Sequence, residues 1–256
     1  MPTIRIDDAD LFYALHRGDE TNQRQLILIH GAGGSHLHWP AGLRRLPQTN
    51  VYALDLPGHG RSGGEGRTTI EAYTDAIMAL VEGLSLNRVT VAGHSMGGAI
   101  TQTLALRRPG WLEGLILVGT GARLRVAPAI LDGILADAPT AIDLICSWAY
   151  GPNTPPELLE AGRQAMLDLK PEIIHGDYRA CDAFDVMQKL DQIRQPTLVI
   201  AGSEDKLTPP KYSAFLADKI PGARLVTIEG AGHMMMLEHP QAVARAFAGF
   251  FAGEST

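Results

Sequence analysis

Short apolar runs recur along the chain, and segments with the apolar spacing of helices separate them. The runs at 26–29, 89–92 and 115–118 are apolar at nearly every position, which is typical of parallel strands buried on both faces. Further strands are expected at 3–6, 11–15, 51–54, 197–200 and 224–228. The first two predict an N-terminal hairpin that turns at Asp7 and Asp8.

Apolar residues recur with helical spacing near 70–84, 96–108, 209–219 and 239–252. Between positions 118 and 197 no strand-like run occurs, and helical pieces are expected near 127–137, 140–149, 156–169 and 178–190. An insertion of roughly 70 residues is too long for a simple crossover, so we expect a helical cap at the carboxyl edge of the sheet. The predicted fold is α/β: a mostly parallel eight-stranded sheet flanked by helices, with the cap inserted before the seventh strand. Residues 1–120 and 191–256 would form the core domain and residues 121–190 the cap.

The composition narrows the class of protein. With 256 residues and 45% apolar content the chain can build a sizeable core, and its net charge of −6 argues against nucleic acid as a partner. No apolar stretch is long enough to span a membrane and no signal peptide precedes the first strand, so a cytoplasmic location is expected. Cys146 and Cys181 lack metal-site spacing and are interpreted as reduced thiols, although a disulfide between them stays open. No metal or organic cofactor is expected.

Ser95 is the candidate nucleophile. It lies in Gly-His-Ser-Met-Gly at positions 93–97, directly between a predicted strand and a predicted helix. A serine on such a sharp turn projects its hydroxyl, and glycines two residues to either side avoid collisions with neighbouring backbone. The helix that follows directs its N-terminal N–H groups to the place where negative charge develops. A structural turn serine is the alternative, and the second match to this pattern, around Ser62, is interpreted as a flexible loop.

A serine nucleophile needs a general base, and the base needs an orienting carboxylate. His233 follows the last predicted strand in Glu-Gly-Ala-Gly-His, where a glycine-flanked loop leaves its side chain free, although a surface histidine is the alternative. Asp205 follows the seventh predicted strand, and Glu204 is its rival. Among the other histidines, His59 is interpreted as a packing residue and His94 as directed away from the serine.

Four motifs follow one another along the chain: His-Gly-Ala-Gly-Gly at 30–34, Asp-Leu-Pro-Gly-His-Gly-Arg-Ser at 55–62, the elbow at 93–97, and Gly-His at 232–233. In this order they resemble the motifs of the α/β-hydrolase family over nearly the whole chain, and the elbow is similar to that of serine esterases and lipases. The order serine, aspartate, histidine is also that of the family. The resemblance implies an oxyanion hole formed by the N–H of Met96 and by that of Ala32, or secondarily of Gly33. It also favours Asp205 over Glu204.

A dinucleotide-binding loop is the competing interpretation of the glycines at 31–33. The fingerprint requires a third glycine at position 36, which is His36, although Asp55 supplies an acid at a suitable distance. This interpretation leaves Ser95, Asp205 and His233 unexplained, so it is not favoured.

The expected chemistry is hydrolysis of a small-molecule carboxylic ester through an acyl-enzyme. The candidate substrate contacts are His36, Trp39, Leu124, Trp148, Tyr150 and Met234. Their largely apolar character predicts a small to medium uncharged substrate, with ordinary packing as the alternative for each residue. Two other functions stay open. In the first, the same three residues catalyse lactone opening, C–C bond hydrolysis, or perhydrolase or haloperoxidase chemistry. In the second, the chain is a hydrolase-like ligand receptor.

Overall fold

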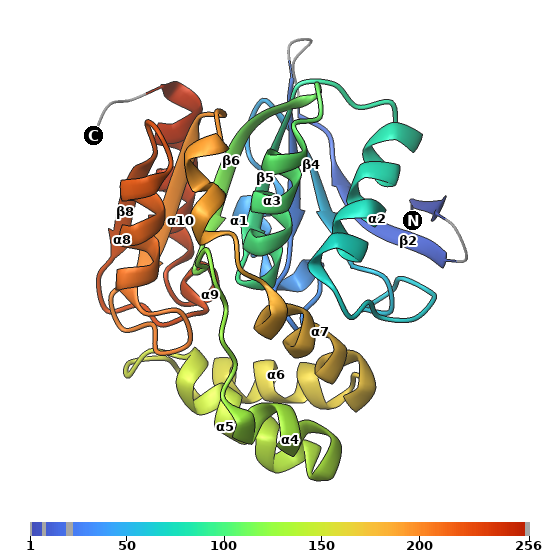
Figure 1. Ribbon diagram of the computed structural model, residues 1–256, viewed down its shortest axis with the longest axis vertical. Helices are drawn as coiled ribbons and strands as arrows, with labels where there is room; N and C mark the ends of the chain where they lie inside the picture. Colours follow the sequence, from blue (N-terminus) through green and yellow to red (C-terminus); the bar gives the residue numbers. More distant parts are fainter. Residues whose placement is uncertain (1, 7–8, 19–22, 254–256) are drawn as a thin grey trace.

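The computed structural model describes residues 2–6, 9–18 and 23–253, and an eight-stranded sheet forms its centre (Figure 1). The strands lie in the order β1-β2-β4-β3-β5-β6-β7-β8. β1 pairs antiparallel with β2 and β2 with β4, whereas the later pairs are parallel. The bounds are β1 Thr3–Ile6, β2 Ala9–His16, β3 Arg24–Ile29, β4 Thr49–Leu54, β5 Val89–His94, β6 Leu112–Val118, β7 Thr197–Gly202 and β8 Arg224–Ile228. The predicted sheet is confirmed, and the turn predicted at Asp7 and Asp8 lies outside the described residues.

Alternate side chains of the central strands enter two separate cores. In β3, Ile27 and Ile29 pack in the cluster on one face of the sheet, while Leu26 and Leu28 pack in the cluster on the other, and all four are fully buried. Successive side chains of a strand point to opposite faces, so a strand covered on both sides must be apolar at consecutive positions. This requirement explains the unbroken apolar runs in the sequence.

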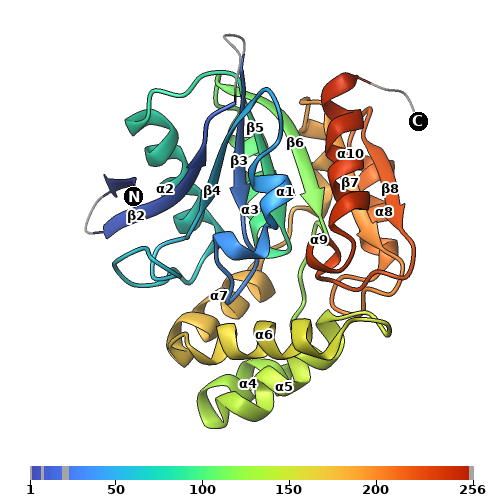
Figure 2. The same ribbon diagram turned by 180° about the vertical axis from the view of Figure 1, so that it is seen from behind.

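Helices cover both faces of the sheet. α2, α3 and α8 lie on the face seen in Figure 1, and α1 and α10 lie on the face seen in Figure 2. The bounds are α1 Ala41–Arg44, α2 Ile70–Gly83, α3 Met96–Arg107, α8 Pro210–Lys219, α9 Met235–Glu238 and α10 Pro240–Ala252. The four long helices were predicted to within two residues. The short α1 and α9 were not, because four residues are too few for a periodic signal.

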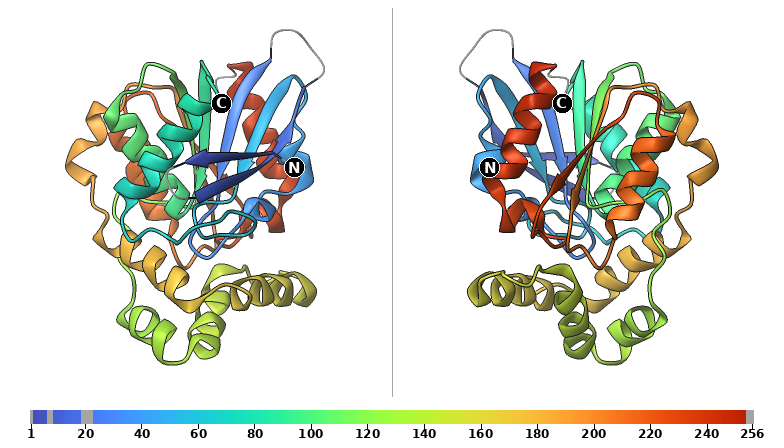
Figure 3. Two further views of the ribbon diagram at one scale, coloured as in Figure 1. Left: turned by 90° about the vertical axis from the view of Figure 1, so that its right-hand side faces the viewer. Right: turned by 90° about the vertical axis from the view of Figure 1, so that its left-hand side faces the viewer.

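Four further helices lie between β6 and β7 in the chain and below the carboxyl edge of the sheet (Figures 1 and 3). They are α4 Pro128–Ala136, α5 Ala138–Ala149, α6 Pro156–Leu167 and α7 Pro171–Ala183. Each has proline in its first turn, where the missing N–H would have no partner in any case. The last helix, expected at 178–190, begins seven positions earlier and ends at Ala183, because Pro171 starts α7 rather than interrupting it; a 3₁₀ helix follows at Met187–Gln192. We call these four helices the cap; its domain boundaries at 121 and 190 stay a prediction.

Within the described part of the chain, no helix is both long enough and apolar enough to cross a lipid bilayer. The cytoplasmic location expected from the sequence stays a prediction.

Candidate active site

Ser95 occupies a strained turn between β5 and α3, with φ of 52° and ψ of −115°. A Cβ on Gly93 would lie 2.1 Å from the carbonyl oxygen of Gly97, and one on Gly97 would lie 2.4 Å from that of Ile29. Both contacts are with backbone and cannot be relieved by a side-chain rotation. The glycines at 93 and 97 are therefore what allows a serine to sit at this turn.

Ser62, the second serine flanked by glycines, holds a loop in place. Its hydroxyl donates to the carbonyl oxygen of Asp55 at 2.6 Å and accepts from the N–H of Phe12 at 2.9 Å. The first hydrogen bond closes the loop after β4 and the second ties that loop to β2, so the sequence pattern alone does not separate a reactive serine from a structural one.

His233 and Asp205 meet although 28 positions separate them in the chain. His233 follows β8, Asp205 follows β7, and Nδ1 of the imidazole lies 2.8 Å from Oδ2 of the carboxylate. Both side chains are buried. Glu204, the rival acid, is exposed. Its backbone N–H, rather than its carboxylate, forms a hydrogen bond near this site, to the carbonyl oxygen of Ala231.

The Asp205 carboxylate is held in its ionised form. The N–H groups of Leu207 and Thr208 donate to Oδ1 at 2.9 and 2.8 Å, and the Thr208 hydroxyl donates to Oδ2 at 2.8 Å. Burial alone raises the pKa of Asp205, but attraction to His233 and the hydrogen bonds from His233 and Thr208 outweigh burial and lower the pKa below its usual value. The neutral imidazole consequently keeps its proton on Nδ1, which leaves Nε2 as an acceptor.

Ser95 and His233 line the same cavity between the sheet edge and the cap. The ring of His94 packs beside that of His233 with centroids 4.6 Å apart, and His94 Nε2 donates to the carbonyl oxygen of His233 at 3.0 Å. Gly119, directly after β6, lies against the pair, since a Cβ there would be in van der Waals contact with Nδ1 of His233 at 3.4 Å and with Oδ2 of Asp205 at 3.5 Å. The ends of four neighbouring strands thus bring these groups together.

The loop after β3 passes directly beside the serine. A Cβ on Gly31 would lie 3.0 Å from the Cβ of Ser95, so the backbone approaches the serine at this point. The carbonyl oxygen of Gly31 accepts from Gly34 N–H at 3.1 Å and from Nδ1 of His30 at 2.8 Å, which fixes this turn. We call residues 30–34 the oxyanion loop, after the role that the sequence predicts for it.

The three N–H groups expected at the oxyanion hole differ in their partners. The N–H of Gly33 donates to the carboxylate of Asp177 at 2.9 Å and is therefore occupied. The N–H of Met96 is the first of α3, so no carbonyl four residues earlier in the helix accepts from it. Ala32 lines the cavity. This arrangement favours Ala32 and Met96 over Gly33.

Two of the expected substrate contacts lie elsewhere. Trp39 is fully buried in the core on the α10 side of the sheet, where its ring packs against Phe247 at 6.2 Å between centroids. The ring of His36 is turned to the buried carboxylate of Asp55, with Nδ1 2.9 Å from Oδ1. The short turn of 3₁₀ helix at His36–His38 directs the side chains in this way and leaves His38 at the cavity.

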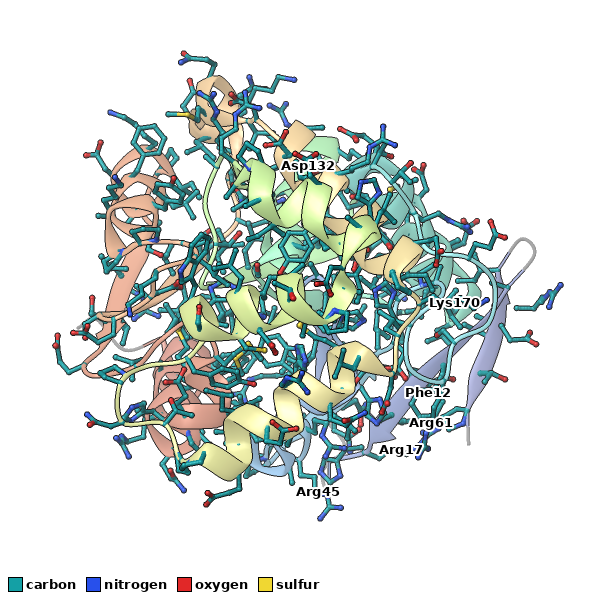
Figure 4. All side chains as sticks on the ribbon, turned by 90° about the horizontal axis from the view of Figure 1, so that it is seen from below. Phe12, Arg17, Arg45, Arg61, Asp132 and Lys170 are labelled. Atoms are coloured by element: carbon teal, nitrogen blue, oxygen red, sulfur yellow. The ribbon has the colours of Figure 1, made fainter. Side chains whose placement is uncertain are left out.

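The cavity has a volume of about 290 Å³ and mostly apolar walls. Leu124, Trp148, Tyr150 and Met234 all line it, and their role as substrate contacts stays a prediction. Apolar side chains that the sequence did not single out complete the walls: Val126, Ile130, Ile145, Met166 and Leu207. Several lie on cap helices, and their apolar spacing marked them as buried without showing that they face a cavity. Figure 4 views the molecule from the side of the cap that covers this space.

Among the other lining residues, Arg125 and Lys206 carry a positive charge and are exposed to solvent, whereas His38, His94 and the two cysteines are uncharged. Burial, followed by repulsion from His233, lowers the pKa of His38 to about 4, and burial lowers that of His94 well below its ordinary value. Cys146 and Cys181 line the cavity as free thiols, and burial raises the pKa of Cys146 to about 11. Within residues 2–6, 9–18 and 23–253, no group of three or more His, Cys, Asp or Glu side chains is arranged to hold a metal ion.

Comparisons with known proteins agree with this architecture. A pimeloyl-(acyl-carrier protein) methyl ester esterase of Neisseria meningitidis is 29% identical over 252 residues, which cover 90% of this chain and 94% of that protein. A solved thermophilic esterase is 36% identical with a TM-score of 0.87, and the alignment covers 98% of this chain and 97% of that esterase. The enol-lactonase of Burkholderia xenovorans LB400 is 26% identical with a TM-score of 0.90, and covers 98% of this chain and 100% of its own. The model of the alpha/beta hydrolase family matches residues 26–246, and the chain belongs to that family.

Proposed function

We propose that this protein is a serine hydrolase that cleaves carboxylic esters through an acyl-enzyme intermediate. The observation that carries the proposal is the buried His233–Asp205 hydrogen bond of 2.8 Å beside the cavity that the strained Ser95 also lines. The relatives named as esterases support an enzyme that acts on ester bonds.

Each residue has a defined part in the reaction. Nε2 of His233 accepts the Ser95 hydroxyl proton as the oxygen attacks the ester carbonyl, and Asp205 stabilises the resulting imidazolium. The N–H groups of Ala32 and Met96 donate to the oxyanion. The imidazolium then protonates the leaving alcohol, which departs as the C–O bond breaks. His233 next removes a proton from water, the hydroxide attacks the acyl group, and the acid leaves as Ser95 regains its proton.

The walls of the cavity set the substrate class. Leu124, Trp148, Tyr150 and Met234 present apolar surface, and about 290 Å³ accommodates a small to medium uncharged acyl or alcohol group. Arg125 and Lys206 also line the cavity but are exposed to solvent, and a charged group buried against the apolar walls without a partner would cost on the order of several kcal/mol. We therefore propose uncharged esters of short to medium chain length.

Lactone hydrolysis is the second candidate, and the likeness to an enol-lactonase favours it. A lactone is a cyclic ester, so the same attack and proton transfers apply. The difference is that the leaving alcohol stays attached to the acyl group, and the cavity must hold the opened chain.

The test is turnover of p-nitrophenyl esters from acetate to decanoate beside γ- and δ-lactones. We expect multiple turnovers with a preference for short to medium acyl chains, and Ser95→Ala should lower kcat by about 10⁴- to 10⁶-fold. A Ser95→Ala protein that kept most of the activity would overturn the assignment of the nucleophile. A wild-type protein that binds such esters without repeated turnover would instead favour a ligand receptor.

A further inference from the structure

A second buried polar cluster lies beside the oxyanion loop, and the proposed reaction does not use it. Its centre is Asp177, which lies in the middle of the cap helix α7 and is fully buried. A carboxylate in such a place is costly unless it is hydrogen-bonded and its charge is balanced. We call Asp177 and its partners His59, Tyr73 and the Gly33 N–H the Asp177 cluster.

The partners of Asp177 come from three parts of the core. Oδ2 accepts from the N–H of Gly33 at 2.9 Å and lies 2.8 Å from Nε2 of His59, while Oδ1 accepts from the hydroxyl of Tyr73 at 2.5 Å. Gly33 belongs to the oxyanion loop, His59 to the loop after β4, and Tyr73 to α2. One cap carboxylate therefore fastens three core segments that are more than 100 positions away in the chain.

His59 balances the charge of Asp177. Its Nδ1 lies 3.0 Å from the carbonyl oxygen of Pro57 and its Nε2 lies 2.8 Å from the carboxylate. Both partners are acceptors, so both ring nitrogens must carry protons and the ring is an imidazolium. Burial alone lowers the pKa of His59, but attraction to Asp177 and the hydrogen bond with it outweigh burial and raise the pKa above its ordinary value.

Groups from four segments face the ring of His59. The groups that face it are Asp177 from α7, Tyr73 from α2, His30 and His38 from the segment after β3, and Asp55 from the end of β4. Burial lowers the pKa of both His30 and His38, so neither adds a positive charge at neutral pH. The nearest opposite charge is that of Asp177.

The peptide between Gly31 and Ala32 is fixed from the core side. The Leu56 N–H donates to Nε2 of His30 at 3.0 Å, so His30 carries its proton on Nδ1 and donates it to the Gly31 carbonyl at 2.8 Å. In a planar trans peptide the N–H points opposite to the carbonyl. The hydrogen bonds to the Gly31 carbonyl therefore restrain the direction of the Ala32 N–H from the core side.

The next peptide is fixed from the cap side. The N–H of Gly33 donates to Asp177, so the plane of the peptide between Ala32 and Gly33 is set by α7. Gly33 has a φ of +64°, and its place is close to the cap, since a Cβ there would lie 3.0 Å from Met166 of α6. Ala32 is consequently held between one peptide tied to the core and one tied to the cap.

We propose that Asp177 is a positioning residue of the cap that holds the oxyanion loop by the Gly33 N–H and so aims the Ala32 N–H at the reacting carbonyl. This inference rests on the proposed function. Its consequence is that the oxyanion hole is complete only when α7 is docked on the core.

The test compares Asp177→Ala, which removes all three hydrogen bonds, with Asp177→Asn, whose amide oxygen still accepts from Gly33. Misplacement of an oxyanion donor slows acyl transfer more than substrate binding. We expect Asp177→Ala to lower kcat for p-nitrophenyl butyrate by about 10²-fold with KM changed less than about threefold, and Asp177→Asn to recover kcat to within about tenfold. The Gly33 amide proton should move upfield in NMR spectra of Asp177→Ala.

Two control variants separate positioning from loss of stability. Glu172→Ala removes an exposed carboxylate from the same helix and should change neither kcat nor the Gly33 resonance. Ile142→Val makes a small cavity within the cap and should lower the melting temperature while kcat stays within about twofold. Equal losses of kcat in Ile142→Val and Asp177→Ala would overturn the proposal.

The remaining outcomes are also decisive. Unchanged kcat in a folded Asp177→Ala protein, or an unshifted Gly33 resonance, would overturn the inference. If Asp177→Ala does not fold, Asp177→Leu decides, because leucine has nearly the same shape as aspartate but offers Gly33 no acceptor: a lower kcat at constant KM with a shifted Gly33 amide supports positioning, and unchanged values refute it. A wild-type protein that neither hydrolyses esters nor is labelled at Ser95 by diethyl p-nitrophenyl phosphate would refute the proposed function, while the Gly33 resonance would still report on the Asp177 contact.

Discussion

Replacing Asp205 by asparagine is the sharpest test of the proposed reaction, because the surrounding hydrogen bonds dictate how the amide must lie. The N–H groups of Leu207 and Thr208 both donate to Oδ1 at 2.8–2.9 Å, so this position requires an acceptor and takes the amide oxygen. The amide NH₂ then replaces Oδ2 and faces Nδ1 of His233, which lies 2.8 Å away. The variant thus offers a donor where the wild type offers an acceptor.

The consequence is a change of tautomer rather than a loss of the fold. A donor opposite Nδ1 favours the imidazole with its proton on Nε2, and that nitrogen can then no longer accept the proton of Ser95. The same change in serine proteases costs about 10⁴-fold in kcat. This corresponds to about 5.5 kcal/mol of transition-state stabilisation, and we expect a loss of that order here.

The assay is kcat and KM for p-nitrophenyl butyrate at pH 7–9, with the melting temperature of each variant measured alongside. Glu204→Gln is the matched control, because it neutralises the adjacent acid, which is exposed. Its kcat should stay within about twofold. A loss below about tenfold in a folded Asp205→Asn protein, or a larger loss in Glu204→Gln, would refute the assignment of Asp205.

Two further predictions concern stability. Ser62→Ala removes the hydrogen bonds to Phe12 and Asp55 and should lower the free energy of unfolding by about 1–3 kcal/mol in urea titrations. Its kcat should stay within about threefold of the wild-type value. A loss of kcat like that of Ser95→Ala would contradict the structural role of Ser62. Since the pKa of His38 is about 4 in the folded protein and about 6.5 when unfolded, the unfolded state binds more protons between these values. This histidine should therefore destabilise the fold as the pH falls from about 6.5 to 4. His38→Gln should weaken that acid dependence in thermal melts, and an unchanged dependence would contradict the burial of a neutral His38.

Most of the fold could be predicted from the sequence because the patterns that indicate strands and helices are local. The strands and long helices followed from apolar spacing within about ten residues, and the glycines at 93 and 97 marked the elbow by the room that their neighbours leave. Pro171 was misinterpreted as a break, since proline fits the first turn of a helix as well as a loop.

The direction in which single side chains point was decided by tertiary packing. Trp39 lies in the core rather than at the cavity. Both places are apolar, so the sequence alone does not indicate which of them an apolar side chain occupies. His36 contacts the buried carboxylate of Asp55, 19 positions away in the chain. Such contacts depend on which residues the fold brings together, and local periodicity in the sequence does not predict them.

The Asp177 cluster shows this division most clearly. The sequence determined that α7 would exist near this place and that a glycine-rich loop would follow β3. Only the folded chain brought Asp177 to Gly33 across 144 positions, because the docking of the cap on the sheet edge sets that distance. A charged residue in a helix is ordinarily on the surface, so burial of this carboxylate required partners that became visible only in three dimensions.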